Sequence, residues 1–377
     1  MSTRVSGRYP TSRSRRLVRP EDGRRHNVEF VLQSVYDSPG LTRADLARQT
    51  GLTRVTISEL VAQLLADGLI AEAGPNQQVR PGKPGTRLDP VPEARDILAL
   101  DLSNQSTLRG AVLDLRGRVL ERRQQPLDKA QGPAALARVT ALAHDLAAAA
   151  KHLVVGLGVG SPGLIAADGR ILAATSLGWS DFELAGPLEA ALGCPVEVCN
   201  DANLAAVAER RFAQGHDNLL RVQIATGVGA ALLVGGDPVL GEHSAAGEIG
   251  HVVVEPDGVD CLCGKRGCLE TWLAVPPLTA RLAAAPGRRD QVLAQAGRHL
   301  GQVLAPIVSA LDLSQVVLGG PADLIAGPLL EASQRLVGDH TRVDFRAPVT
   351  LSHSTLGDDA VLLGAAAHVL RRRLGVQ

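Results

Sequence analysis

The 377-residue sequence lacks several features that would assign it to large classes of protein. It has no apolar run long enough to cross a bilayer and no stretch with the pattern of a secretory signal. We therefore expect a protein of the reducing cytoplasm with no membrane partner. It has only five cysteines, and in that compartment clustered thiols bind metal more often than they form disulfides. Its formal net charge is zero, so attraction to a polyanion must come from one part of the chain.

The charge is unevenly distributed along the chain. Residues 1–90 hold 14 Lys and Arg against 9 Asp and Glu, which gives +5 and leaves 25 against 30, or −5, for residues 91–377. A basic module joined to an acidic body is the pattern expected when only one end meets a polyanion. We predict a disordered basic arm over 1–20, a DNA-binding domain over 21–90 and a larger body over 91–377. The arm holds six Arg and too little apolar sequence to offset ordering, so it is either a solubilising tail or a source of sequence-independent phosphate attraction.

Residues 24–72 have the pattern of three short helices followed by a wing. Apolar residues recur at helical spacing in the first helix, Thr42 and Thr53 are placed to cap the second and third, and a Gly-containing turn separates those two. Strands Leu69–Ala71 and Thr86–Leu88 are expected to pair around a loop rich in Pro and Gly. The interpretation is a winged helix-turn-helix; a helical hairpin for protein contact and a plain linker remain the alternatives. Candidate DNA contacts are Arg43, Thr53, Arg54, Thr56, Ser58, Arg80 and Lys83.

The body has the pattern of a duplicated α/β unit. Two stretches repeat the order strand, turn, strand, turn, strand, each before helical sequence. The predicted strands are Ile97–Leu102, Leu108–Leu115 and Gly117–Leu120 in the first, and Leu219–Ala225, Gly229–Val234 and Pro238–Leu240 in the second. Two such units indicate two lobes with a cleft between them.

The segment Gly247–Glu270 concentrates residues that bind metal. Cys261, Cys263 and Cys268 lie within eight residues of one another, with His251 ten residues upstream. Three thiolates and one imidazole make a closed tetrahedral zinc site, which would be structural because no coordination position stays open. The alternative is a set of ordinary reduced thiols beside a polar histidine.

The same segment resembles, almost position for position, the signature of the ROK family of repressors, open reading frames and sugar kinases: GE-[IL]-GH followed by C-x-C-G-x2-GC-x-E. The phrase LTRADLARQTGLTRVTISELVAQLLADGLI is similar to the DNA-binding half of ROK repressors, and NDAN at 200–203 to the family's ND-x-N motif. The resemblance implies an actin-like body of the sugar kinase, Hsp70 and actin superfold. It also implies zinc on His251, Cys261, Cys263 and Cys268, and sugar contacts from Asn200, Asp201, Glu248, His251 and Glu270.

Whether the body is a kinase depends on its phosphate loops. ROK kinases begin the first meander with D-x-G-G-T, where this chain has Asp101–Gln105 with neither glycine. A Cβ at those positions restricts the close approach of backbone to phosphate. Ala225–Gly229 keeps two glycines, whereas Val317–Pro321 ends in Pro, which has no N–H to donate. One intact loop of three does not make a nucleotide site.

We therefore predict a sugar-responsive repressor with structural zinc, whose partners are double-stranded operator DNA and a monosaccharide or sugar phosphate. Because such modules usually read paired half-sites, we expect a homodimer or a dimer of dimers. The alternative is an active ATP-dependent sugar kinase fused to a DNA-binding domain, with Asp201 as general base.

Overall fold

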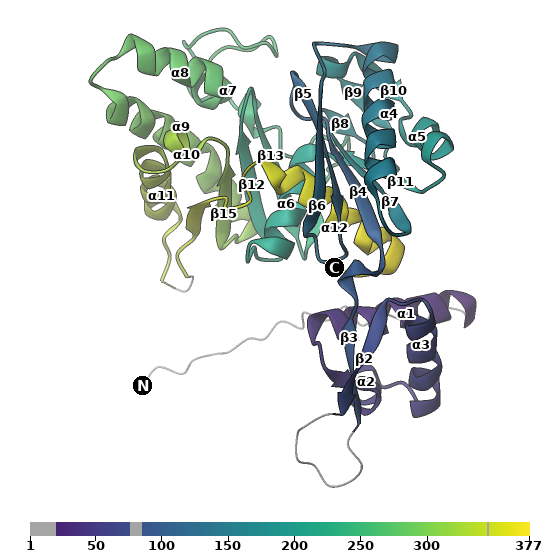
Figure 1. Cartoon of the computed structure of the whole chain (residues 1–377). Coiled ribbons are helices and arrows are strands. Elements are labelled where there is room, and N and C mark those ends of the chain that lie inside the picture. The colour runs from purple at the N-terminus through teal and green to yellow at the C-terminus, as the bar shows by residue number, and fades with distance from the viewer. Residues whose placement is uncertain (1–19, 76–84, 345–346) are drawn as a thin grey trace, which may run out of the picture. The chain divides into compact units, whose positions relative to one another are not determined.

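The computed structural model describes residues 20–75, 85–344 and 347–377 (Figure 1). The chain divides into two compact units between Val91 and Pro92, and Leu374–Val376 belong to the first of them. The predicted arm at 1–20, apart from Pro20, lies outside the described residues, as do Arg80 and Lys83. None of the described helices combines the length and apolar character needed to cross a membrane.

The first unit is a winged helix-turn-helix, as predicted. Its elements are α1 (Pro20–Asp37), β1 (Leu41–Thr42), α2 (Arg43–Thr50), α3 (Arg54–Ala66), β2 (Ile70–Pro75) and β3 (Thr86–Pro90). The three strands form one sheet in the order β1-β3-β2, and β2 runs antiparallel to β3. The apolar stripes of the helices form the core, where Val31, Leu46, Ile57, Val61 and Leu64 have no exposed surface.

Capping residues set the ends of α2 and α3. Thr42 and Asp45 form a capping box at the start of α2, each side chain bonding the other's backbone N–H. Gly51 then ends α2 in the left-handed conformation, with φ of 71°, which glycine adopts at low cost. Thr53 caps α3 by accepting a hydrogen bond from the backbone N–H of Thr56. The turn between the two helices is therefore encoded locally.

The second unit is the predicted duplicated α/β body. Its first half contains β4 (Asp96–Asp101), β5 (Thr107–Leu113), β6 (Val119–Pro126), α4 (Gly132–Ala149), β7 (Val154–Ser161) and β11 (Val196–Asn200). Between β7 and β11 lie β8 (Leu164–Ile165), β9 (Ile171–Ala174), β10 (Trp179–Phe182) and α5 (Ala185–Leu192). The strands β8–β10 form a small sheet that was not predicted.

The second half repeats the plan with longer helical insertions. Its strands are β12 (Leu219–Ile224), β13 (Val228–Val234), β14 (Asp237–Pro238), β15 (Gln315–Gly319) and β16 (Thr350–His353). Its helices are α6 (Asp201–Phe212), α7 (Glu270–Leu273), α8 (Val275–Ala284), α9 (Arg289–Leu311), α10 (Ala322–Ile325), α11 (Pro328–Thr341) and α12 (Ala360–Leu374).

The duplication is visible in the strand order of the two large sheets. One runs β6-β5-β4-β7-β11 and the other β14-β13-β12-β15-β16, so three antiparallel strands are followed by two parallel strands in each. Helix α6 contacts strands of both sheets, and in Figure 1 α6 and α12 lie between them. Helix α12 approaches β7 so closely that a Cβ on Gly158 would lie 2.5 Å from the carbonyl oxygen of Ala365. Strand β11 ends at Asn200, directly before α6 begins at Asp201.

Candidate functional site

Three of the predicted DNA contacts at α3, Thr53, Thr56 and Ser58, form hydrogen bonds within the helix and its N-terminal cap. The hydroxyl groups of Thr53 and Thr56 lie 2.9 Å apart at the helix start, where Thr53 serves as the cap. Ser58 donates its hydroxyl hydrogen to the carbonyl of Arg54 at 2.9 Å. The guanidinium of Arg54 makes no ion pair with any residue in the described part of the chain, so it is the predicted contact most available to DNA.

The remaining predicted DNA contacts are in other settings. Arg43, at the start of α2, forms a 2.9 Å ion pair with Glu72 on β2, so its charge is partly compensated. Residues 1–19 and 76–84 hold six and two of the basic residues of the first 90 and none of the acidic ones. The other residues up to 90 therefore hold six basic and nine acidic residues, so the basic excess of the first 90 residues comes from residues 1–19 and 76–84.

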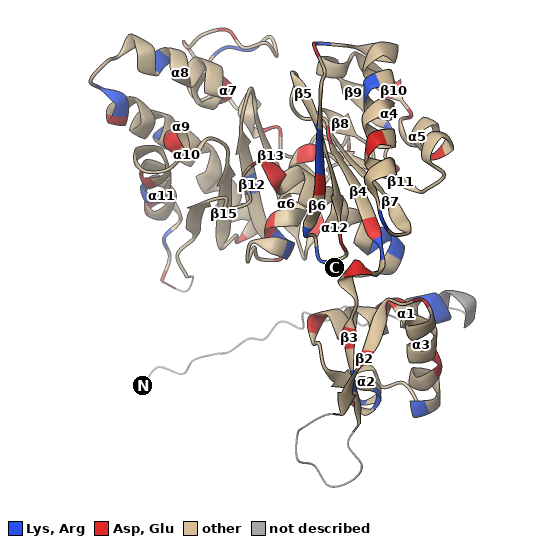
Figure 2. Ribbon diagram, viewed as in Figure 1, with Lys and Arg blue, Asp and Glu red and all other residues tan. Residues whose placement is uncertain are grey.

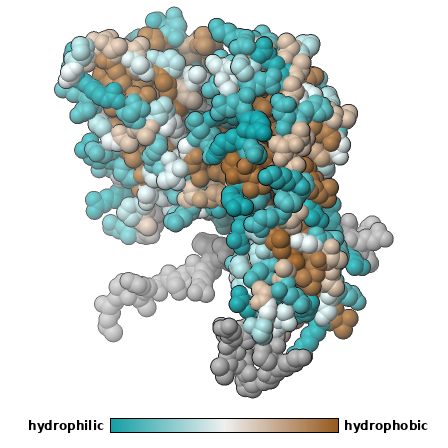
Figure 3. All heavy atoms as spheres, in the orientation of Figure 1, coloured by the Kyte–Doolittle hydropathy of each residue, from teal (hydrophilic) through white to brown (hydrophobic). Residues whose placement is uncertain are grey.

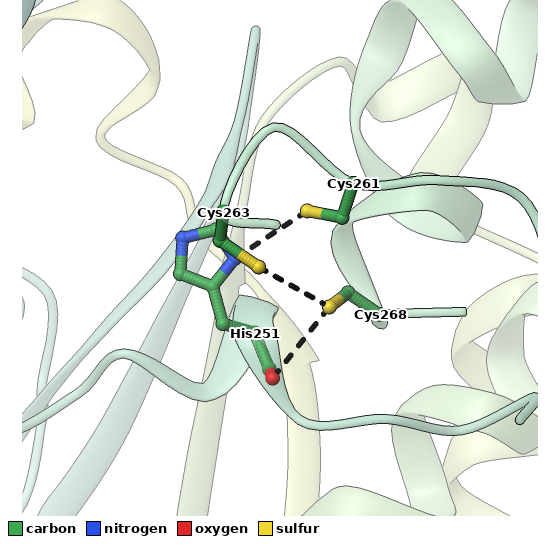
Figure 4. Close-up of side chains that lie close together, drawn as sticks. All are labelled: His251, Cys261, Cys263 and Cys268. Atoms are coloured by element: carbon green, nitrogen blue, oxygen red, sulfur yellow. Dashed lines mark hydrogen bonds between the residues drawn. The ribbon is translucent and has the colours of Figure 1, made fainter. Parts of the chain in front are cut away.

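The four predicted metal ligands come together (Figure 4). One ligand atom from each of His251, Cys261, Cys263 and Cys268 lies within 4.8 Å of all the others. The sulfurs of Cys263 and Cys268 are 3.6 Å apart, and Cys261 Sγ is 3.7 Å from His251 Nδ1. Tetrahedral zinc with ordinary bond lengths would require about 3.8 Å between two sulfurs and about 3.6 Å between sulfur and nitrogen. The donor set and its spacing fit one tetrahedral ion.

The backbone around these ligands has little regular structure of its own. Two isolated bridges, Val253–Cys268 and Asp260–Arg266, are its main strand-like pairing. Gly267 has φ of 65° and lies so close to Glu255 that a Cβ would be 1.6 Å from its carbonyl oxygen, so only glycine fits there. An ion at the centre would tie this loop to the 3₁₀ turn Ile249–His251.

The two ring nitrogens of His251 face different groups. Nδ1 points to the cysteine cluster, whereas Nε2 lies 3.9 Å from the carboxylate of Glu248, which is 55% exposed. A metal on Nδ1 would fix the ring and leave Nε2 for a ligand hydroxyl beside Glu248. Glu270, at the start of α7, instead accepts a hydrogen bond from the backbone N–H of Val228 at 3.0 Å. This bond ties the metal segment, Gly247–Glu270, to the first residue of β13.

Asn200 and Asp201 stand where β11 meets α6. The amide of Asn200 caps α6 by accepting from the N–H of Asn203 and donates to the carbonyl of Gly163 at 2.9 Å. The adjacent Asp201 carboxyl lies in a low-dielectric site. Desolvation, and then the nearby charge of Asp101, raise its pKa from 3.8 to about 7, against an opposing effect of the buried Arg221. A carboxyl that titrates near neutrality suits proton exchange with a hydroxyl.

The predicted sugar contacts thus form two groups. Asn200 and Asp201 belong to the start of α6, and Glu248, His251 and Glu270 belong to the metal segment. Within the described residues no hydrogen bond or ion pair joins the two groups.

The three loops that match phosphate loops are occupied by the protein's own groups. Arg109 contacts the buried Asp101 carboxylate through two nitrogens, at 2.7 and 3.2 Å, and reaches Asp358 at 3.0 Å. In the second loop, the N–H of Val228 is taken by Glu270. In the third, His353 Nε2 lies 3.0 Å from the carbonyl of Gly320.

Two arginines in this region were not predicted from the sequence. Arg109 compensates Asp101, and Arg221, 2% exposed, forms a buried pair with Glu209 and donates to Gln223. The Arg221 guanidinium also lies over Gly319, where a Cβ would be 2.3 Å from one nitrogen. Both arginines lie in strands whose other residues are mostly apolar. A charged residue within such a strand was the sequence feature that could have identified them.

Comparisons with known proteins agree with this architecture. The ROK family model matches residues 98–372 and the MarR family model matches residues 30–78. The xylose repressor of Bacillus subtilis is 23% identical over 365 residues, which are 91% of this chain and 94% of that protein. The glucokinase of Halalkalibacterium halodurans is 30% identical over 250 residues, 57% of this chain and 76% of the relative.

Among solved structures, a ROK family transcriptional regulator described as a homologue of the E. coli MLC protein superposes with a TM-score of 0.81 at 23% identity, covering 93% of this chain and 96% of that one. That likeness extends over both units, whereas the glucokinase matches only part of the chain. On the family match across most of its length, this chain belongs to the ROK family.

Proposed function

We propose that this protein is a transcriptional repressor that binds operator DNA through its winged helix and releases it in response to a sugar. One observation carries the proposal: a capped helix-turn-helix and a ROK body occur in a single chain. The match to the xylose repressor covers 91% of this chain and therefore includes both parts. A freestanding sugar kinase has no use for the first unit.

The metal in this proposal is a structural zinc ion. Support comes from the donor set, three thiols and one imidazole within 4.8 Å of one another, which leaves no open position for catalysis. The ion orders the segment that carries Glu248 and His251. These side chains and Glu270 form one wall of the sugar site, with Asn200 and Asp201 on the other.

Hydroxyl groups suit these residues because carboxylates accept, and the amide and imidazole donate or accept, in defined directions. Sugar that binds both walls favours a closed body. A difference in sugar affinity between the open and closed states is what lets the sugar shift DNA binding. The repressor acts as a homodimer or a dimer of dimers because paired modules read paired half-sites.

Phosphoryl transfer is the less favoured activity. Phosphate cradles depend on free backbone N–H groups and glycines at the point of contact. In this chain Arg109 neutralises Asp101, and Glu270 accepts from the N–H of Val228. The Asp201 carboxyl is retained and can bind a hydroxyl without a nucleotide beside it.

A thermal-shift screen of the purified protein against monosaccharides, xylose and glucose included, and their phosphates tests the proposal. We expect one sugar to raise the melting temperature and to release DNA enriched by the protein from genomic fragments. Glu248→Ala should bind this DNA but fail to release it. Sugar-dependent ADP formation from MgATP would support the kinase instead, and no shift with any sugar would contradict sugar sensing.

A further inference from the structure

The outward face of α3 is a stripe of five residues that differs from the set expected from the sequence. A shallow surface on this face is lined by Arg54, Val55, Ser58, Glu59 and Ala62. These residues are spaced so that they stand above one another on successive turns. Figure 2 shows that α3 carries both basic and acidic residues. The stripe is therefore not a uniformly basic surface.

Val55 is an apolar residue that the described part of its own unit leaves largely exposed. It is 69% exposed in the first turn of α3, directly after Arg54, whereas Ile57, Leu60 and Val61 are buried. Figure 3 shows hydrophobic atoms reaching the surface of this unit among hydrophilic ones. In a helix whose first turns enter the major groove, an apolar side chain at this position meets the one apolar group displayed there, the C5 methyl of thymine.

Glu59 stands one turn further along the same stripe. Its carboxylate forms no ion pair with any residue that the structure describes, and it is exposed. On a surface that approaches phosphates an uncompensated carboxylate is repelled, unless it accepts a hydrogen bond from a base amino group. Cytosine N4 is the donor that carboxylates recognise in the major groove.

We infer that Val55 and Glu59 determine the DNA sequence this protein reads, Val55 by contact with a thymine methyl and Glu59 by accepting from a cytosine amino group. This rests on the proposed function. Different residues at α3 then cap the helix and recognise the bases. Thr53 and Thr56 hold the start of α3, and the stripe on α3 supplies the specificity.

Selection of duplexes from a random pool by the full-length protein tests the inference. Replacing each thymine of the selected site by uracil removes only the C5 methyl. One such replacement per half-site should weaken binding of the wild type about fourfold, the equivalent of one buried methyl group. It should weaken binding of Val55→Ala less, because the shorter alanine side chain buries less of the thymine methyl. Glu59→Gln should shift the selected base at one position from cytosine to adenine, because an amide both accepts from and donates to adenine.

Matched controls separate these effects from general surface changes. Leu153→Ala removes an apolar side chain that is 70% exposed on the body, and Glu242→Gln removes an exposed carboxylate there. Both should select the wild-type site. If Val55→Ala and Glu59→Gln also select that site with unchanged uracil sensitivity, the inference is wrong while the repressor proposal stands. If the wild type enriches no sequence at all, sequence-specific DNA binding fails, and the inference with it.

Discussion

At the scale of single residues, Asp201 is the group whose charge state is most sensitive to its surroundings. Its carboxyl is desolvated at the start of α6 and lies near the carboxylate of Asp101, while Arg221 favours the charged form only in part. Asp101 is itself held by Arg109. Desolvation and the nearby carboxylate of Asp101 both favour the protonated form of Asp201. Asp201 therefore changes charge in the neutral range.

This pKa predicts a pH dependence of sugar binding. If a sugar hydroxyl donates to the carboxylate of Asp201, as proposed, binding requires the ionised form. With a pKa of about 7, the ionised fraction falls as the pH drops through 7, and the affinity should be about tenfold weaker at pH 6 than at pH 8. Calorimetric titration at both values measures it. Asp201→Asn should remove this component, and an equal ratio in the variant and the wild type would assign it to another group.

At the scale of elements, the metal segment is a loop without regular secondary structure, so an ion bound by its four ligands would add to its order. Residues 252–269 are joined by two isolated bridges and by single backbone hydrogen bonds of turns and loops, rather than by a regular helix or sheet. The metal segment also holds Glu270 against the first residue of β13. Loss of the ion should therefore disorder Glu248, His251 and Glu270, the proposed sugar contacts of this segment, and leave the first unit unchanged.

Removal of the metal is the matching experiment. Dialysis against a chelator, or Cys263→Ser, should abolish the sugar-induced rise in melting temperature while DNA binding in the absence of sugar is kept. Elemental analysis should find about one zinc per chain in the untreated protein. Cys194→Ser, which changes a cysteine outside the cluster, should keep both the metal and the sugar response. Full sugar response in metal-free protein would contradict the scaffold role.

The contact between α12 and β7 depends on glycine. A Cβ on Gly158 would meet the backbone of Ala365 at 2.5 Å, and backbone cannot rotate away. Gly158→Ala should destabilise the body by about 1–3 kcal/mol. Both tryptophans, Trp179 and Trp272, lie in the body, so their fluorescence during urea unfolding reports on it. Gly338→Ala in α11 has open space around the new Cβ and should be neutral or slightly stabilising. Equal effects of the two changes would show that close packing is not the cause.

The sequence predicted well those elements whose apolar residues lie on one face at regular spacing. The capped helices of the first unit and the two meanders depend on neighbours in the chain, so periodicity and turn residues suffice. Strand β6 was predicted to end at Leu120 but continues to Pro126. As an edge strand it exposes Arg122 and Arg123, and polar residues hid the pattern. The small β8–β10 sheet was missed because its strands are too short for alternation to register.

The candidate site was predictable to the same extent. The metal cluster lies within one short loop, so spacing alone indicated it. The pairs Arg109–Asp358 and Arg122–Asp359 join residues far apart in sequence, and no local pattern reveals such partners. Asn200 was expected as a sugar contact. Its hydrogen bonds as helix cap and as donor to Gly163 depend on the pairing of β11 with β7, which no local pattern reveals.

At the scale of the whole molecule, the chain returns to its first unit after forming nearly all of the second. It leaves the first unit at Val91 and returns to it at Leu374. Val376 is 1% exposed, and a Cβ on Gly375 would lie 2.4 Å from the side chain of Glu29 on α1. Leu374–Val376 therefore pack with the N-terminal unit.

Truncation after Arg373 isolates this contribution. Losing the buried Val376 should cost the first unit about 1.5–3 kcal/mol, so amide hydrogen exchange in α1 should accelerate and DNA binding should weaken. The sugar-induced rise in melting temperature of the body should be unchanged, because Asp201, Glu248 and His251 all belong to the second unit. Removal of the exposed Gln377 alone is the control and should leave exchange in α1 as in the wild type. Unchanged exchange after the longer truncation would mean that the tail adds nothing to the DNA-binding unit, whereas loss of the sugar response as well would mean that α12 carries stability for both.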